Sequence, residues 1–410
     1  MVYIVFCYFI VLVLFSKYRK YKLASYLIAV YTFSLFFSIL LVNTDNNPNY
    51  RYTSLFASLI YCVVLLFYFV PFFKSNRAIK ANTSKLFISH FSLIGYFLSG
   101  ILLLGCVLIL SKIQEAIAYG LVDIRVAMNK DEIVFGYYNT FEHIGHSILR
   151  WLHRLSYPIL ILFFYAFVFI EKKHILKVMM FISSLSGAYF GLMVGGRTNL
   201  MYWILFFLFC LVLFWSYLTK KNKRIIYTIS LVSLSFLAFY FIIITVGRAE
   251  HGHAGDTGSF LLSYTGQSYL NFCYFIENLN FHTYSTSRIF PLTNSILFGR
   301  FDLSEYRFLI EQKSGMNIGI FYTFIGDIFV DLGLFGVLIY SILYFLIAKK
   351  IMKKTEFTLS SLLIVGIIYQ IPLHGVFYYS LWRMESSVCI IITILIAKYL
   401  QNINSIKWRN

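Results

Sequence analysis

Apolar residues occur along this chain in runs of about twenty, separated by short polar segments. A helix of about 20 apolar residues has the length that is needed to cross a bilayer. The pattern therefore predicts an all-α polytopic membrane protein with about eleven transmembrane helices, in a single integral membrane domain over residues 1–410. The runs that we assign as spans cover residues 2–16, 23–42, 53–73, 86–111, 155–170, 176–194, 199–218, 225–246, 333–348, 359–374 and 386–400.

Two of the connecting segments are long, residues 112–154 and residues 247–332. Long segments in compact proteins are usually functional or disordered, and the richness of 247–332 in Phe, Tyr and Ile argues against disorder. Within it, 259–279 resembles a span, but a crossing there would break the alternation of the basic segments. We expect an interfacial or re-entrant helix, with Tyr264 at headgroup depth, and a twelfth span remains the alternative.

The basic residues are sorted between two sets of connecting segments. Every second connection, beginning with the one after the first run, is rich in Lys, and with the C-terminal tail this set carries 22 of the 35 Lys+Arg, only four of them Arg. By the positive-inside rule this set is cytoplasmic, which places the N-terminus outside and the C-terminus inside. The formal net charge of +18 is then an orientation signal towards anionic lipids and not a nucleic-acid footprint.

The other set of connections carries the remaining 13 basic residues, and ten of these are Arg. Arginine on the outer face runs against the charge bias, so these side chains are expected to have a specific role. A guanidinium group can bind phosphate through two parallel hydrogen bonds. The pattern predicts a membrane enzyme that handles a phosphorylated lipid on the outer face.

The first candidate motif is "GLMVGGRTNL" (191–200), which places Arg197 in a short turn between two spans. Gly195 and Gly196 allow a tight turn and the close approach of a ligand, and Asn199 can cap the next helix. An arginine near membrane depth is costly unless it is paired or used. The alternative is that Arg197 only reaches out to headgroup phosphates.

The second motif is "VGRAEHGHAGD" (246–256), where a helix enters the large outer segment. Arg248 would bind phosphate while Glu250 or His251 acts as a general base. His251, His253 and Glu250 are also ligand types for a metal, but their spacing matches no familiar zinc motif, so no metal site is expected. A plain polar start of the loop remains the alternative.

Acidic and basic residues are interleaved further along the outer segment. Asp327 and Asp331 are four residues apart in an apolar stretch and therefore share one helix face. They are expected to pair with Arg197 or Arg383, or to line a polar cavity. The arginines before them, at 288, 300 and 307, are expected to form some ion pairs, and the pattern leaves open which of them binds a ligand.

The last outer turn is "PLHGVFYYSLWRMESS" (372–387). His374 lies at a helix end, and Arg383 precedes the next helix. The aromatic residues between them are typical of a membrane-interface belt, and they would also stack on sugar rings.

Taken in order, these features resemble the oligosaccharide repeat-unit polymerases of bacteria, the Wzy-type O-antigen or capsule polymerases. The resemblance covers nearly the whole chain. It rests on the number of spans, the large outer segment in the second half, "GGRTN" (195–199), Gly247-Arg248 at a helix exit, and "NIGIFYTFIGDIFVDLGLFG" (317–336).

The resemblance implies a metal-independent glycosyltransferase without a cofactor, in the bacterial inner membrane with its site facing the periplasm. It would polymerise oligosaccharide repeat units carried on undecaprenyl pyrophosphate, with a chain-length regulator and a flippase as possible partners. The implied catalytic residues are Arg197 and Arg248, which hold the pyrophosphate, and Glu250, His251 and His374 as candidate bases. The implied substrate-binding residues are Arg288, Arg383, Asp327, Asp331, Asn199 and Tyr264.

Two rival functions remain. An O-antigen ligase differs only in its acceptor. A flippase for lipid-linked oligosaccharide also needs arginine for pyrophosphate, but it has no need of the long segment 247–332 and should carry charges deep in its spans. The spans of this chain are nearly free of charge, which favours an enzyme.

Overall fold

The computed structural model of the chain describes residues 1–44, 50, 53–73, 78–120, 138–193, 196–231, 235, 257–285, 287–299, 303–316, 320–381 and 383–406. These residues form two compact units. Unit 1 comprises Met1–Ala78, Ala254–Thr355 and Ile367–Ser387, and unit 2 comprises Ile79–His253, Glu356–Gly366 and Val388–Asn410.

The protein is a helical, multi-pass membrane protein. Eight of the described helices are long and apolar enough to cross a membrane, and two shorter apolar helices, Val2–Tyr18 and Leu359–His374, accompany them. Ten of the predicted spans coincide with described helices. The span predicted at 225–246 is described only at 225–231 and 235, so the total of about eleven spans stays a prediction.

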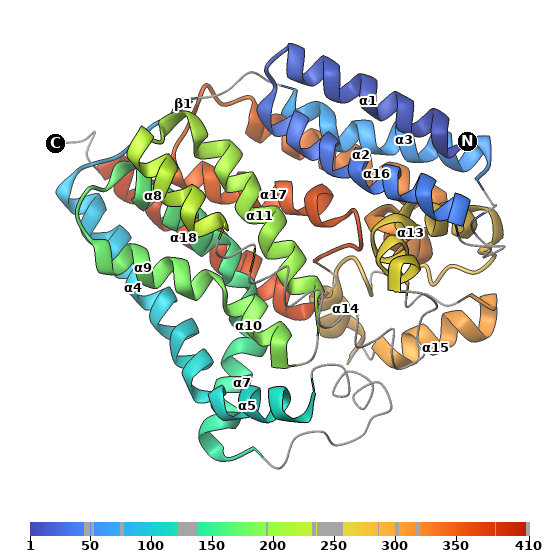
Figure 1. Cartoon of the computed structure of the whole chain (residues 1–410). Helices are drawn as coiled ribbons and strands as arrows, with labels where there is room; N and C mark the ends of the chain where they lie inside the picture. The colour runs from blue at the N-terminus through green and yellow to red at the C-terminus, as the bar shows by residue number, and fades with distance from the viewer. Residues whose placement is uncertain are drawn as a thin grey trace. The chain divides into compact units, whose positions relative to one another are not determined.

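Unit 1 combines helices from the N-terminal part of the chain with helices from its C-terminal half. Its elements are α1 (Val2–Tyr18), α2 (Lys22–Thr44), α3 (Leu55–Phe69), the 3₁₀ turn η2 (Val70–Phe72), α13 (Thr257–Asn278), α14 (Pro291–Phe298), α15 (Leu303–Ser314) and α16 (Thr323–Met352). Helix α1 packs on α2, and α3 packs on α16 (Figure 1). An aromatic cluster of Phe9, Tyr31, Tyr61 and Phe69 fills the space between the first three helices.

Helix α13 contains the predicted interfacial segment and is not among the helices that are long and apolar enough to cross. It packs closely on α2. The Ser34 and Ser38 hydroxyls donate to the carbonyls of Thr265 and Gly266 at 2.9 and 2.6 Å. A Cβ at Gly266 would lie 2.5 Å from the Phe37 carbonyl oxygen, so only glycine permits this approach. The helix is present as predicted, and its interfacial or re-entrant placement stays a prediction.

Helix α16 is bent inside its length. Gly333 has φ 65° and ψ −173°, a conformation that an L-residue rarely adopts, and it separates residues 323–332 from the longer remainder of the helix. The predicted span began at this glycine, so the structure extends the helix by about three turns in the N-terminal direction. The added piece carries Asp327 and Asp331.

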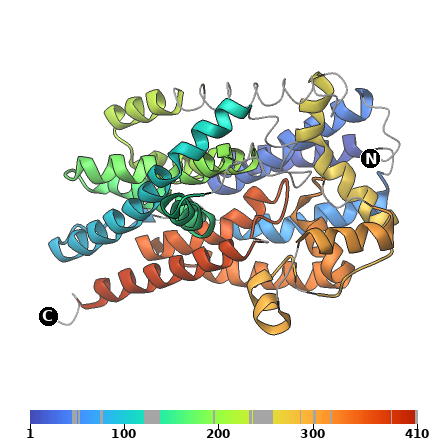
Figure 2. The same cartoon turned by 90° about the horizontal axis from the view of Figure 1, so that it is seen from below.

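Unit 2 is built around a second set of apolar helices, cyan to yellow-green in Figure 2. Its elements are α4 (Lys85–Leu108), α5 (Leu110–Tyr119), α7 (Thr140–Leu152), η3 (His153–Leu155), α8 (Ser156–Phe169), α9 (His174–Ser184), α10 (Ser186–Met193), α11 (Thr198–Phe214) and η4 (Trp215–Tyr217). Two helices, α17 (Leu359–His374) and α18 (Met384–Ile406), contribute residues to both units.

The predicted loop 112–154 is partly helical. Helix α7, η3 and α8 form one apolar stretch of 30 residues, Thr140–Phe169, which starts earlier than the predicted span. Polar residues recur throughout α7, at Glu142, His143, His146, Ser147 and Arg150, and they hid the helix from a search for continuous apolar runs. One face of α7 packs on α4, where Gly105 and Gly145 face bulky side chains of the opposite helix.

Two short strands join basic connections that are distant in sequence. Strand β1 (Ala78–Ile79) pairs with β2 (Glu356–Phe357). Next to them, the Lys80 amide donates to the Phe357 carbonyl at 2.9 Å, and Lys80 lies 3.8 Å from Glu356. This pairing agrees with the prediction that the two connections lie on one side of the membrane.

Candidate functional site

The most tightly organised charged cluster of unit 1 joins a loop to the first part of α16. The guanidinium of Arg288 forms an ion pair with Asp327, and the side chains of both residues are buried, 1% and 0% exposed. Arg288 also lies over the ring of Tyr322, 5.5 Å from its centroid. The described ion-pair partner of Asp327 is thus Arg288, whereas the sequence had suggested Arg197 or Arg383.

Asp331 completes the cluster one helical turn further on. It accepts hydrogen bonds from the Arg288 backbone amide at 2.8 Å, from the Thr283 hydroxyl at 3.1 Å, and from the Tyr306 hydroxyl. Three donors from one loop and from α15 therefore converge on one buried carboxylate. The two aspartates share a helix face, as predicted, and together they hold the loop around Arg288 against α16.

The cluster places one guanidinium beside two carboxylates. Burial works to lower the pKa of Arg288, but the neighbouring carboxylate of Asp327 outweighs it, so the pKa is raised and the guanidinium stays charged. Burial, together with the charge of Asp331, raises the pKa of Tyr306 well above its usual range. Tyr306 therefore stays protonated and serves as a hydrogen-bond donor to Asp331.

The backbone around α16 brings His374 into the same part of unit 1. The Phe324 amide donates to the Gly375 carbonyl at 2.9 Å, and the Tyr379 amide donates to Asp327 at 2.6 Å. Thr323, where α16 begins, has φ 67°, a strained value for a β-branched residue. His374 is fully buried at the end of α17. The structure thus assembles Arg288, Asp327, Asp331 and the turn after His374.

Arg197, the centre of the first motif, belongs to unit 2. It is the N-cap of α11 and is 2% exposed. The turn before it is tight, because the Gly196 amide donates to the Gly191 carbonyl at 2.9 Å. Asn199 lies in the first turn of α11, half-buried. A buried guanidinium beside a helix N-terminus places two sources of positive potential together.

The remaining predicted residues are distributed as follows. Arg248, Glu250, His251, His253 and Arg300 lie outside the described residues. Tyr264 falls in α13, but its side chain is outside the described part. Arg383 is exposed at the start of α18. In the described ranges there is no group of three or more His, Cys, Asp or Glu that could hold a metal ion.

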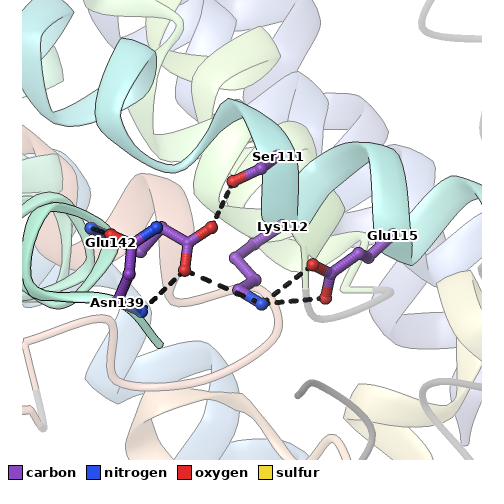
Figure 3. A network of polar contacts seen from close by, with 5 residues as sticks. All are labelled: Ser111, Lys112, Glu115, Asn139 and Glu142. Atoms are coloured by element: carbon purple, nitrogen blue, oxygen red, sulfur yellow. Dashed lines mark hydrogen bonds and ion pairs between the residues drawn. The ribbon is translucent and has the colours of Figure 1, made fainter. Parts of the chain in front are cut away.

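A second polar network, in unit 2, was not predicted (Figure 3). Lys112 of α5 is buried and binds Glu115 at 2.8 and 3.0 Å, and it lies 3.8 Å from Glu142 of α7. Glu142 also accepts from the Ser111 hydroxyl at 2.5 Å and from the Asn139 amide at 2.9 Å.

The network fastens the two helices that flank residues 121–137. Asn139 and Glu142 form a capping box, in which the Glu142 amide donates to the Asn139 side chain at 2.9 Å. The sequence "NTFE" (139–142) carries the signature of such a cap, which would have located the start of α7.

No protein-family model, curated protein or solved structure matches this chain. The resemblance to the repeat-unit polymerases therefore stays a prediction from the sequence motifs.

Proposed function

We propose that this protein is a glycosyltransferase that polymerises oligosaccharide repeat units carried on undecaprenyl pyrophosphate, at the outer face of the bacterial inner membrane. The observation that carries the proposal is Arg197, a buried guanidinium at the N-terminus of a membrane-length helix. A pyrophosphate is the anion that suits such a position, because guanidinium and helix N–H groups both favour phosphate oxygens.

The chemistry follows from the leaving group. A hydroxyl of the acceptor sugar attacks the anomeric carbon of the donor glycan, a new glycosidic bond forms, and the bond to the pyrophosphate breaks. Negative charge grows on the departing pyrophosphate, and Arg197 with Arg248 would stabilise it. The acceptor proton passes to a general base, for which Glu250, His251 and His374 are the candidates.

In the proposed enzyme, the cluster of Arg288, Asp327 and Asp331 in unit 1 has a positioning role. Arg288 is neutralised by Asp327 and is fully buried, so its role would be to order the loop over 283–288. Arg383 is exposed, and its substrate-binding role stays a prediction. The substrate-binding role suggested for the two aspartates becomes an indirect one, because they hold Arg288.

The test is the glycan ladder of cells that lack the gene and are complemented with the wild type, Arg197→Ala or Arg248→Ala. A matched control is Arg224→Ala, an exposed arginine of a Lys-rich connection. Membrane levels of each protein are measured in parallel. We expect the wild type and the control to restore the ladder, and the two other variants to leave a single repeat unit on the lipid.

Other outcomes separate the rival functions. Full ladders from well-expressed Arg197→Ala and Arg248→Ala would show that these arginines are structural. Loss of every surface repeat, including the single one, points to a flippase. A ladder that builds up on the lipid carrier without transfer to its final acceptor points to a ligase.

A further inference from the structure

A second buried arginine of unit 2 has no counterion among the residues that the structure describes. Arg154 is 7% exposed, and its Nε and Nη1 atoms are buried without a hydrogen-bond partner. Its guanidinium lies 5.9 Å from the centroid of the Tyr202 ring and shares a side-chain hydrogen bond with Tyr157. Both neighbours are neutral, and no carboxylate of the described ranges pairs with Arg154.

Arg154 occupies a break in an apolar stretch. It sits in η3, between α7 and α8, inside the 30-residue stretch Thr140–Phe169. Helix α10 packs on this break, since a Cβ at Gly187 would contact the His153 carbonyl oxygen at 3.6 Å. Ser186, the first residue of α10, is a second buried donor whose hydroxyl has no partner.

An isolated charge in such surroundings is unfavourable for folding. Burying a guanidinium without an anion forfeits its hydration, and here it returns only the weak attraction of an aromatic ring and a hydrogen bond to a neutral hydroxyl. Ionisable groups at membrane depth are therefore usually paired with another charge or used to bind one. The described protein supplies no anion for Arg154, so the anion would come from a ligand.

We propose that Arg154 binds a phosphate group of a lipid at the break between α7 and α8. Phosphate suits the forked donors that are left over, Nε and Nη1, because guanidinium binds its oxygens through two parallel hydrogen bonds. A lipid suits the place, because the site lies within a helix of membrane length. Two sources carry this chemistry, a phospholipid headgroup and the pyrophosphate of a polyprenyl carrier, and the proposal does not require the glycosyltransferase activity.

The experiment measures lipid binding to the purified full-length protein in a non-ionic detergent. The probes are phosphatidylglycerol and undecaprenyl pyrophosphate, with diacylglycerol and undecaprenol as matched lipids without phosphate. Arg154→Gln is compared with the wild type and with Arg150→Gln, an exposed arginine one turn earlier on α7. Native mass spectrometry gives the bound fraction at each lipid concentration.

We expect Arg154→Gln to weaken the binding of at least one phosphate lipid by about ten- to a hundredfold, the range for a hydrogen bond to a charged group. Arg150→Gln should bind as the wild type does. If only the binding of undecaprenyl pyrophosphate is lost, the ligand of Arg154 is the polyprenyl carrier. If only the binding of phosphatidylglycerol is lost, the ligand is a phospholipid headgroup. Equal binding of both phosphate lipids by the wild type and Arg154→Gln would overturn the proposal, as would failure of the wild type to prefer phosphate.

A stability measurement separates binding from a structural role. In delipidated detergent, Arg154→Met should unfold at the same temperature as the wild type or a higher one, because it removes an uncompensated charge. The phosphate lipid should raise the unfolding temperature of the wild type only. A lower unfolding temperature of Arg154→Met without lipid would identify Arg154 as structural and overturn the proposal. The glycan ladder is an independent readout, so this site and the proposed activity can fail separately.

Discussion

Arg288 of unit 1 and Arg154 of unit 2 are both buried, but their surroundings differ in one respect. Arg288 lies against two carboxylates and two aromatic rings, whereas the described partners of Arg154, Tyr157 and Tyr202, are neutral. The first charge is neutralised within the fold and stabilises a loop. The second has no carboxylate partner in the described ranges, and we propose that a lipid phosphate supplies its anion. Burial of an arginine is therefore a poor indicator of function until its counterions are known.

The largest effect should come from removing the counterion of Arg288. Asp327→Ala leaves a buried guanidinium facing no charge, and we expect the free energy of unfolding to fall by roughly 3–5 kcal/mol. Denaturant titration in detergent measures it. Glu305→Ala, an exposed acid on α15, is the control and should change stability by at most about 0.5 kcal/mol.

A double replacement sharpens this result. Arg288→Met combined with Asp327→Leu removes both charges, and a buried ion pair can be exchanged for apolar residues at little cost. The double variant should be more stable than Asp327→Ala alone. If both variants are equally unstable, the loss comes from packing and not from the isolated charge.

A smaller effect is expected at the second carboxylate of the cluster. Tyr306→Phe removes one of three donors to Asp331, and a hydrogen bond to a charged group contributes about 1.5–3 kcal/mol. The same denaturant titration measures the change. Tyr284→Phe, at an exposed tyrosine next to Thr283, is the control. Unchanged stability of Tyr306→Phe would mean that water replaces the hydroxyl and that the cluster is accessible to solvent.

Lys112 of unit 2 provides an intermediate case between the two arginines. Its partner Glu115 is 46% exposed and can be solvated again, while Glu142 keeps its bonds from Ser111 and Asn139. Lys112→Met should therefore lower the free energy of unfolding by only about 1 kcal/mol. A loss as large as that of Asp327→Ala would show that the network of Figure 3 is as tightly coupled as the cluster of unit 1.

The smallest effect concerns pH. His282 precedes Thr283, whose hydroxyl donates a hydrogen bond to Asp331. Burial lowers the pKa of His282, so the folded protein disfavours the imidazolium. The unfolded chain therefore gains a proton at His282 before the folded protein does. The stability of the folded protein is complete above the ordinary histidine pKa of about 6.5 and decreases as the pH falls below it. Unfolding temperatures at about pH 7.5 and pH 5.5 measure the loss. The wild type should lose more than His282→Gln, and equal losses would place the sensitivity elsewhere.

The sequence predicted the helical membrane architecture well, because continuous apolar runs depend on local composition alone. It also placed Asp327 and Asp331 on one face. It missed their partner, since helices α14 and α15 lie between Arg288 and Asp327 in the sequence and only tertiary packing brings the two residues together. Helix α7 was missed for a different reason, because polar residues along its length interrupt the apolar pattern.

Arg154 was overlooked because the predicted span started just after it. From sequence, an arginine at the edge of an apolar run is expected to reach into the headgroup region. The structure instead places it inside a longer helical stretch, where its burial becomes apparent. Whether a charged residue has a counterion depends on distances between side chains, which a hydropathy pattern does not contain.

The conformation of Gly333 also bears on how this chain can vary in length. In an uninterrupted helix, each residue inserted or deleted turns everything beyond it by about 100°. Gly333 interrupts the helical path between the aspartates and the apolar remainder of α16, so the rotational phase of one part is not passed on to the other. The apolar part can thus be lengthened or shortened to suit a thicker or thinner bilayer while both carboxylates keep their direction towards Arg288.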